Sequence, residues 1–169
     1  MKSLRTLALL PLAAAAAQAY TIELQLGQSR TTGYDQGTVA GLNIAGQVSQ
    51  SVGLGLNLSN KTIEDSTHSM KVRNASLDIT YELNPRGALH PFIGAGVGYA
   101  WLSNAATFTS TKGVMTTSVF GGIRFELSRS VDVALNFRNN QLLSVPDITG
   151  ANKNTLKNWD STVGLRFKF

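Results

Sequence analysis

The sequence contains no cysteine, only two histidines, and charged residues at just 15% of its 169 positions. Without cysteine the chain has neither disulfides nor thiolate metal ligands. Two histidines are too few for most metal sites, and their spacing fits no zinc motif. The glycines of GAGVG at 94–98 recur every second residue, so they indicate a strand rather than a phosphate-binding loop. No metal, nucleotide or other cofactor is therefore predicted.

The sequence also lacks an apolar run long enough to cross a bilayer as a helix. Near the N-terminus, two basic residues precede an apolar stretch at 7–17 that Pro11 interrupts, whereas a spanning helix needs about 20 residues. The tripeptide AQA, which ends at residue 19, has the form that a signal peptidase accepts. We predict a cleaved signal peptide at 1–19 and one mature domain at 20–169. If this domain enters a membrane, it must do so as strands.

The basic excess is modest in the mature chain. The full sequence has 15 basic and 10 acidic residues, and removal of Lys2 and Arg5 lowers the formal net charge from +5 to +3. No nucleic acid partner is expected from so small an excess. An exported chain without disulfides must be stabilised by a large closed core or by a membrane.

Apolar and polar residues alternate in eight segments of the mature chain. Alternation over about ten residues is typical of a tilted strand with one apolar and one polar face. The last segment, for example, alternates Val163, Leu165 and Phe167 with polar or small residues. The segments lie at 20–28, 39–48, 52–59, 73–83, 91–101, 118–127, 131–138 and 159–169.

Long and short connections alternate between these segments. Short turns lie around 49–51, 84–87 and 128–130. This pattern predicts an all-β fold, an eight-stranded up-and-down antiparallel transmembrane β-barrel with its long loops at one end. The predicted long loops are 29–37, 60–72, 103–112 and 139–157.

The polar face of the segments is predicted to line the interior, and the apolar face to contact lipid. The charged residues share their face with eight glycines, which would weaken a solvent-facing strand but make room inside a narrow barrel. Aromatic residues on the apolar face gather near both strand ends, as in the girdles of membrane barrels. A secreted barrel with an apolar interior is the alternative. The inward glycines are Gly41, Gly53, Gly55, Gly94, Gly96, Gly98, Gly122 and Gly164.

The chain resembles the small eight-stranded outer-membrane proteins: the OmpA transmembrane domain, OmpX and Ail, and the opacity-type surface proteins. HPFIGAGVGYAW at 90–101 is similar to a Pro-aromatic-small alternating strand of that group. The ending TVGLRFKF matches the family's assembly signal at Thr162, Gly164, Phe167 and Phe169. The resemblance implies that the barrel-assembly machinery recognises this ending. Unlike full-length OmpA, the chain is expected to have no periplasmic domain after the barrel.

Charges inside so narrow a barrel are predicted to pair, because an unpaired buried charge is costly. We predict that Arg138 pairs with Asp160 on neighbouring strands, and that Glu23 pairs with Arg166 or Lys168 across the seam between the first and last strands. A plug of ion pairs is favoured over a permeation path. The predicted lumen ion pairs comprise Glu23, Arg124, Arg138, Asp160, Arg166 and Lys168.

Basic residues flank the strand ends on the long-loop side, at the predicted height of the lipopolysaccharide phosphates. Cations there can pair with phosphate, and Trp101 and Trp159 lie just below. Arg73 is the sharpest case, because it is the only outward charge within the eight segments. Ordinary loop solubility is the alternative. The predicted lipopolysaccharide rim comprises Lys61, Lys71, Arg73, Lys112 and Lys157.

One predicted loop holds groups that serve in nucleophilic catalysis. In EDSTHSM at 64–70, Asp65, Ser66, His68 and Ser69 are close in sequence, and some eight-stranded outer-membrane enzymes modify lipid A with such groups. A catalytic site also needs an orienting partner and an oxyanion donor, and the His-x-Ser spacing of lipid A deacylases is absent. We predict a solvated polar loop and no enzymatic activity.

Together, these patterns predict a monomer in the bacterial outer membrane. Its role is expected to be envelope-structural, or to lie in adhesion and host interaction, and to be carried by four extracellular loops. Expected partners are outer-membrane lipid and lipopolysaccharide, the barrel-assembly machinery, and a host or extracellular ligand. A small outer-membrane pore is the alternative, followed by a lipid A-modifying enzyme.

Overall fold

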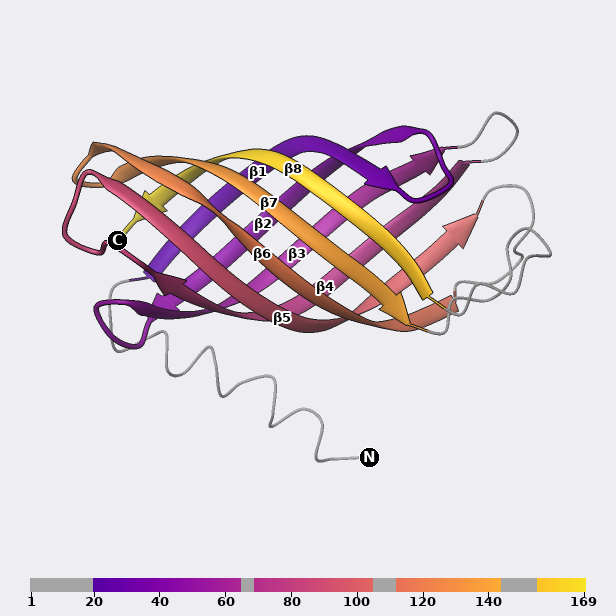
Figure 1. Ribbon diagram of the computed structural model, residues 1–169, viewed down its shortest axis with the longest axis horizontal. Coiled ribbons are helices and arrows are strands. Elements are labelled where there is room, and N and C mark those ends of the chain that lie inside the picture. Colours follow the sequence, from indigo (N-terminus) through magenta and orange to yellow (C-terminus); the bar gives the residue numbers. More distant parts are fainter. Residues whose placement is uncertain (1–19, 65–68, 105–111, 144–154) are drawn as a thin grey trace.

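Eight antiparallel β-strands close into a barrel in the computed structural model, as predicted (Figure 1). Each strand pairs with its neighbours in sequence, and β1 closes the barrel against β8 from Thr21–Lys168 to Thr31–Asn158. The structure describes residues 20–64, 69–104, 112–143 and 155–169, so the predicted signal peptide lies outside it. The strands are β1 (Tyr20–Thr31), β2 (Gln36–Gln47), β3 (Val52–Glu64), β4 (Ser69–Glu82), β5 (Leu89–Asn104), β6 (Lys112–Ser128), β7 (Val131–Leu143) and β8 (Thr155–Lys168).

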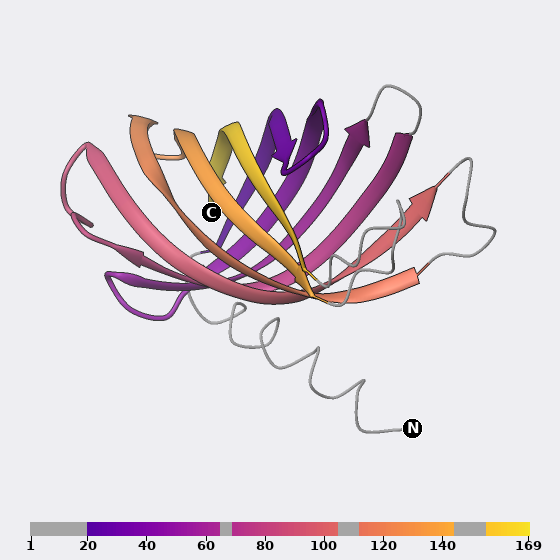
Figure 2. The same cartoon turned by 45° about the vertical axis from the view of Figure 1, so that its right-hand side comes forward.

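The connections gather at two opposite ends of the barrel. β3, β5 and β7 finish together at one end, called the long-loop end, and the C-terminus lies at the other, called the short-turn end (Figure 1). The strands cross the barrel at a steep tilt (Figure 2), which closure of eight strands requires. Within the described ranges, no helix has the length and apolarity to span a membrane.

The apolar face of the strands forms the outer wall, as predicted. Leu26 and Val119 are each 68% exposed, and many other large apolar side chains also point outward. Such a wall would be unfavourable in water but suits hydrocarbon. Most charged residues of the strands lie inside, on the opposite face of the same strands, and the exceptions are near the long-loop end.

The inward glycines make room for large interior side chains, also as predicted. A Cβ at Gly122 would lie 2.8 Å from Cζ of Phe92, and one at Gly94 would come within 3.0 Å of the Phe120 ring. Arg124 stacks over Phe92 at 4.0 Å and Arg138 over Phe120 at 4.2 Å, so each glycine faces an occupied space.

The strands are longer than predicted, and two of the predicted long loops are wrong. β1 and β2 are joined by 32–35, where Gly33 has a positive φ of 86°, and β3 and β4 are joined by 65–68. These connections are no longer than the turn at 48–51. The predicted loops at 29–37 and 60–72 are mostly strand, because backbone pairing continues past the apolar outer wall. The longer connections are 105–111 and 144–154, both at the long-loop end.

Candidate functional site: the lumen and the outer rim

The short-turn half of the lumen contains an ion-pair network centred on Glu82. Arg124 donates to Oε1 of this carboxylate, and Nη1 of Arg166 lies 3.4 Å from the same oxygen. Nδ1 of His90 lies 3.9 Å from Oε2. Arg124 on β6 and Arg166 on β8 therefore join Glu82 on β4 to strands that are not its neighbours in the sheet.

A second acid, Asp132 on β7, forms ion pairs at the short-turn end of the lumen. Nζ of Lys168 lies 2.7 Å from its Oδ1 and 3.2 Å from Oε1 of Glu126. Arg166 lies 3.8 Å from Oδ2 of Asp132, which links this cluster to the one around Glu82. Both basic residues predicted as partners of Glu23 are therefore engaged elsewhere.

Glu23 is held by amides rather than by a basic side chain, so its predicted pairing with Arg166 or Lys168 is wrong. Its Oε1 accepts hydrogen bonds of 2.8 Å from Nε2 of Gln25 and Nδ2 of Asn136. Glu23 is directly opposite Arg166 in the β1–β8 register, but neighbouring backbones do not fix where long side chains reach.

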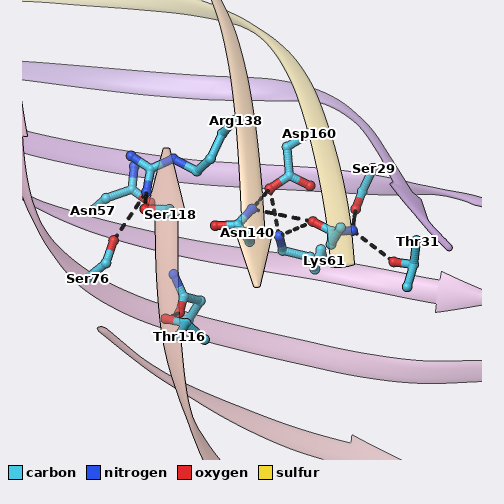
Figure 3. A network of polar contacts seen from close by, with 12 residues as sticks. Ser29, Thr31, Asn57, Lys61, Ser76, Thr116, Ser118, Arg138, Asn140 and Asp160 are labelled. Atoms are coloured by element: carbon cyan, nitrogen blue, oxygen red, sulfur yellow. Dashed lines mark hydrogen bonds and ion pairs between the residues drawn. The ribbon is translucent and has the colours of Figure 1, made fainter. Parts of the chain in front are cut away.

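The predicted pairing of Arg138 with Asp160 is also wrong, although the two residues are directly opposite in the β7–β8 register. The Arg138 guanidinium instead crosses the lumen to Asp78 on β4, binding both carboxylate oxygens. It also donates to Oγ of Ser118 at 3.0 Å and of Ser76 at 3.3 Å (Figure 3). Glycines on β5 leave space for the guanidinium to reach Asp78, and the Phe120 ring packs against the guanidinium.

The partner of Asp160 is Lys61, which corrects the placement of Lys61 on the lipopolysaccharide rim. Lys61 is only 3% exposed, and its Nζ lies 2.6 Å from Oδ2 of Asp160 and 2.7 Å from Oδ1 of Asn158. Asn140 donates to the same Asp160 oxygen at 2.7 Å (Figure 3). Asn158 in turn donates to hydroxyls on β1. Lys61 lies inside because β3 continues past Ser59, with odd-numbered residues pointing inward.

An apolar cluster fills the lumen at the long-loop end, beyond the Lys61–Asp160 pair, with Tyr34 packed against it. Sequence patterns do not predict this cluster, because most of its residues lie in segments that are predicted as loops. Even-numbered residues of β4 and odd-numbered residues of β3 keep their inward phase there. The apolar cluster consists of Ile63, Met70, Val72, Ala100, Leu102, Val114, Leu142 and Leu156.

Below this apolar cluster, the lumen holds a cavity of about 280 Å³. It extends from Ser51 and Pro85 in the short turns to Arg138 and Asp160, and residues of the apolar cluster do not line it. Arg124 and Asp160 each have one buried polar atom without a hydrogen-bond partner in the described part of the chain. Both residues line the cavity, which fits a hydrated interior.

The outer rim holds three of the predicted cations. Lys71, Arg73 and Lys157 all point outward and are exposed. Arg30 on β1 also faces outward, opposite Trp159. It is absent from the predicted rim because the predicted first strand ends at residue 28, whereas β1 continues to Thr31. The Lys112 side chain lies outside the described residues.

The predicted assembly signal lies on the final strand and its end. Thr162 and Gly164 face the lumen, whereas the Phe169 ring stacks on Tyr20 with centroids 5.0 Å apart. Phe169 N also donates to Tyr20 O at 3.0 Å. Phe167 is directly opposite Ile22 on β1, so the signal lies along the β1–β8 seam. Its recognition by assembly machinery stays a prediction.

The candidate catalytic loop lies outside the described residues: positions 65–68 are not described, nor is the Ser69 side chain. Among the described residues, no group of three or more His, Asp or Glu side chains could hold a metal ion.

A closed antiparallel barrel with an apolar outer wall and a charged interior is a transmembrane β-barrel of the outer-membrane type. Residues 3–169 match the family described as outer membrane protein beta-barrel domain, and the chain belongs to that family. It is a protein of the bacterial outer membrane, as its sequence predicts.

Solved structures of other outer-membrane barrels are similar to this chain. Neisserial surface protein A (NspA) has a TM-score of 0.74 at 14% identity, over 89% of this chain and 96% of that one. The N-terminal barrel domain of Pseudomonas aeruginosa OprF has a TM-score of 0.63 at 18% identity, over 90% and 98%. The outer membrane enzyme PagL has a TM-score of 0.53 at 12% identity, over 86% and 97%. At these identities the likeness concerns the fold alone. No curated protein sequence matches the chain.

Proposed function

We propose that this protein is a non-conducting outer-membrane surface protein, with an envelope-structural or adhesion role carried by its extracellular end. The apolar cluster above the Lys61–Asp160 pair supports this proposal. An ion on its way through the lumen would have to enter this apolar layer, which is costly. In outer-membrane barrels the longer loops face outside, so the loops at 105–111 and 144–154 are the surfaces offered to a partner.

The lumen below the apolar cluster is consistent with a plug of ion pairs. Five basic side chains contact acids there. Four of these contacts join strands that are not neighbours in the sheet, whereas Lys168 contacts Asp132 on the neighbouring strand β7. Such cross-links fix the shape of the barrel without requiring a ligand. The basic residues are Lys61, Arg124, Arg138, Arg166 and Lys168.

Planar-bilayer recordings test the closed lumen. We expect the purified barrel to show no steady conductance, or only small and rare openings. A large, stable and ion-selective conductance would instead establish the pore.

Loop exchange tests the surface role. Replacing 105–111 or 144–154 with a Gly-Ser segment of equal length is expected to abolish cell or ligand binding if the role is adhesion, with folding checked by heat-dependent gel mobility. Unchanged binding, together with increased detergent sensitivity of cells that lack the protein, assigns the envelope role.

Because the fold also occurs in the enzyme PagL, the lipid A mass should be measured after expression. A change in that mass would replace the proposal with an enzymatic one.

A further inference from the structure

We propose that the outer wall of β2–β5 carries a binding site for one molecule of phosphorylated, acylated glycolipid, the lipid A part of lipopolysaccharide. The site is a groove at the long-loop end, lined by outward-facing side chains of four consecutive strands. This inference rests on the outer wall alone and does not depend on what the loops or the lumen do. The outward groove residues that carry it are Ala40, Leu42, Leu58, Asn60, Arg73, Ala75 and Trp101.

The strand register arranges the outward residues of this wall in rows of different chemistry. One row runs Ala40, Asn60, Arg73, Trp101, and the row below it runs Leu42, Leu58, Ala75, Tyr99. The next row down is wholly aliphatic: Ile44, Leu56, Leu77, Val97. The row above contains Thr62, Lys71 and Ser103. Polar groups therefore stand directly above an apolar surface, within two residues along each strand.

The groove follows from side-chain size. Ala40 and Ala75 are small, whereas Leu42, Leu58 and Trp101 are large, so the wall is indented between them. Its volume of about 720 Å³ lies within the range of about 300 to 1,000 Å³ typical of ligand sites. The Trp101 ring packs edge-on against Tyr99, with centroids 5.3 Å apart, which makes one side of the groove aromatic.

The cations above the groove have no acidic neighbour in these rows. None of the four rows contains Asp or Glu. Among the described side chains, neither Lys71 nor Arg73 makes an ion pair, whereas all five basic residues of the lumen do. An exposed guanidinium beside hydrocarbon is unfavourable without an anion. No acid among the described side chains pairs with these cations, so the proposed site takes its negative charge from a bound ligand.

The chemistry selects the occupant. A guanidinium binds phosphate oxygens in a bidentate manner, and Lys71 lies two residues further along the same strand face, about 7 Å away. Asn60 and Ser103 add an amide and a hydroxyl suited to sugar hydroxyls. The apolar rows below accept acyl chains, and tryptophan is favoured at such a boundary. The groove lies toward the long loops, hence toward the outer leaflet, where the lipid with a phosphorylated sugar and several chains is lipid A.

Trp101 reports on the lipid that contacts this groove. The chain has two tryptophans, and Trp159 lies in a separate groove on β6–β8, so Trp159→Phe leaves Trp101 as the sole reporter. This variant is reconstituted into vesicles of dibrominated phosphatidylcholine, which quenches Trp101, and unbrominated diphosphoryl lipid A is then added in steps. We expect fluorescence to recover as lipid A displaces the quencher, with a relative affinity about tenfold above that of phosphatidylcholine.

Variants in the same Trp159→Phe background separate this site from general lipid contact. Lys71→Gln/Arg73→Gln should reduce the relative affinity to about that of phosphatidylcholine, and Arg73→Lys should lie between. Ala75→Phe, which fills the groove without changing charge, should also weaken lipid A binding. Arg129→Gln is the matched control, because it removes an exposed charge at the short-turn end, and should have no effect. Heat-dependent gel mobility confirms that each variant is folded.

Titrations with other lipids show which chemical features of the ligand the site recognises. Dephosphorylated lipid A and phosphatidylglycerol should both displace the quencher less well than diphosphoryl lipid A. Equal displacement by dephosphorylated lipid A overturns the role of the cations, and equal displacement by phosphatidylglycerol overturns the glycolipid assignment. Unchanged affinity in both Lys71→Gln/Arg73→Gln and Ala75→Phe overturns the site itself.

Discussion

Removing the Arg138 guanidinium is expected to destabilise the barrel through Asp78, not through its register partner Asp160. Arg138→Met keeps an aliphatic stem near Phe120 but deletes every hydrogen bond from the guanidinium. The Asp78 side chain is 1% exposed and would keep one hydroxyl donor, Ser76 Oγ at 3.0 Å. Removing one partner of a buried ion pair lowers the free energy of unfolding by about 3–5 kcal/mol.

Removing the Asp78 charge should lower the free energy of unfolding by less than removing the Arg138 charge, because the two side chains are buried to different extents. After Asp78→Asn, the Arg138 side chain is still 14% exposed and lines the cavity, where water can solvate it. A loss of about 1–3 kcal/mol is expected for removing one charged hydrogen-bond partner there. The double variant contains neither charge, so its loss should fall short of the sum of the single losses. We expect the difference, the coupling energy, to be about 2 kcal/mol.

Urea unfolding of the barrel in phospholipid vesicles, followed by gel mobility, measures these free energies. The control is the same cycle with Asp160→Asn in place of Asp78→Asn. Because Asp160 is bound by Lys61 and Asn140, its coupling to Arg138 should stay below about 0.5 kcal/mol. A coupling to Asp160 larger than that to Asp78 would refute the cross-lumen geometry.

Three further changes test other parts of the barrel. Lys61→Met should lower the free energy of unfolding by about 3–5 kcal/mol, because Asp160 loses its cation. The control Lys71→Met, on the outer face, should change this free energy by less than about 1 kcal/mol. Equal effects of the two changes would contradict the inward position of Lys61. Phe169→Ser should reduce the amount of folded barrel in the outer membrane, measured by fractionation, with little effect on the barrel once refolded in detergent; normal assembly would remove the signal role. Gly96→Val should destabilise the barrel in urea, because its Cβ would collide with the Asp78 carboxylate, whereas Gly53→Val, where the nearest atom is 3.6 Å away, is the tolerated control.

The number of strands, their order and the inward face could all be predicted from the sequence, because one physical constraint governs them. A strand between lipid and a narrow lumen must carry apolar residues on one face, and polar or small residues on the other. Leu77 and Ile79 against Ser76 and Asp78 on β4 illustrate this constraint. Wherever the constraint acts, alternation fixes which face each residue takes.

The partners of the lumen charges could not be predicted in the same way. Sequence places Arg138 opposite Asp160, because neighbouring strands in an up-and-down barrel have a definable register. The contact between Arg138 and Asp78 instead joins β7 to β4, across the lumen. Which residues meet across a barrel depends on strand tilt and stagger, and neither is encoded in the alternation of one strand.

The predicted strand ends are wrong because the polarity of the two strand faces reverses where the barrel leaves the hydrocarbon, although each residue keeps its inward or outward direction. On β4, Leu77 and Ile79 point outward in the membrane, but Lys71 and Arg73 point outward above it, while Met70 and Val72 point inward. The backbone is continuous strand throughout. A pattern sought as apolar outside and polar inside therefore ends at the membrane surface, although the strand does not.

This reversal explains why charged and apolar layers occupy one lumen. Above the membrane the outer wall meets water and headgroups, so the interior is the only place for large apolar side chains, and the barrel there resembles a soluble one with an apolar core. Within the membrane the outer wall takes the apolar residues, and the interior takes charges that must pair. Lys61 and Asp160 lie where the two regimes meet, directly beneath the apolar cluster. The same boundary on the outer wall places Arg73 directly above an apolar row. The interior seal and the proposed lipid site therefore both arise from the level at which the chain leaves the bilayer.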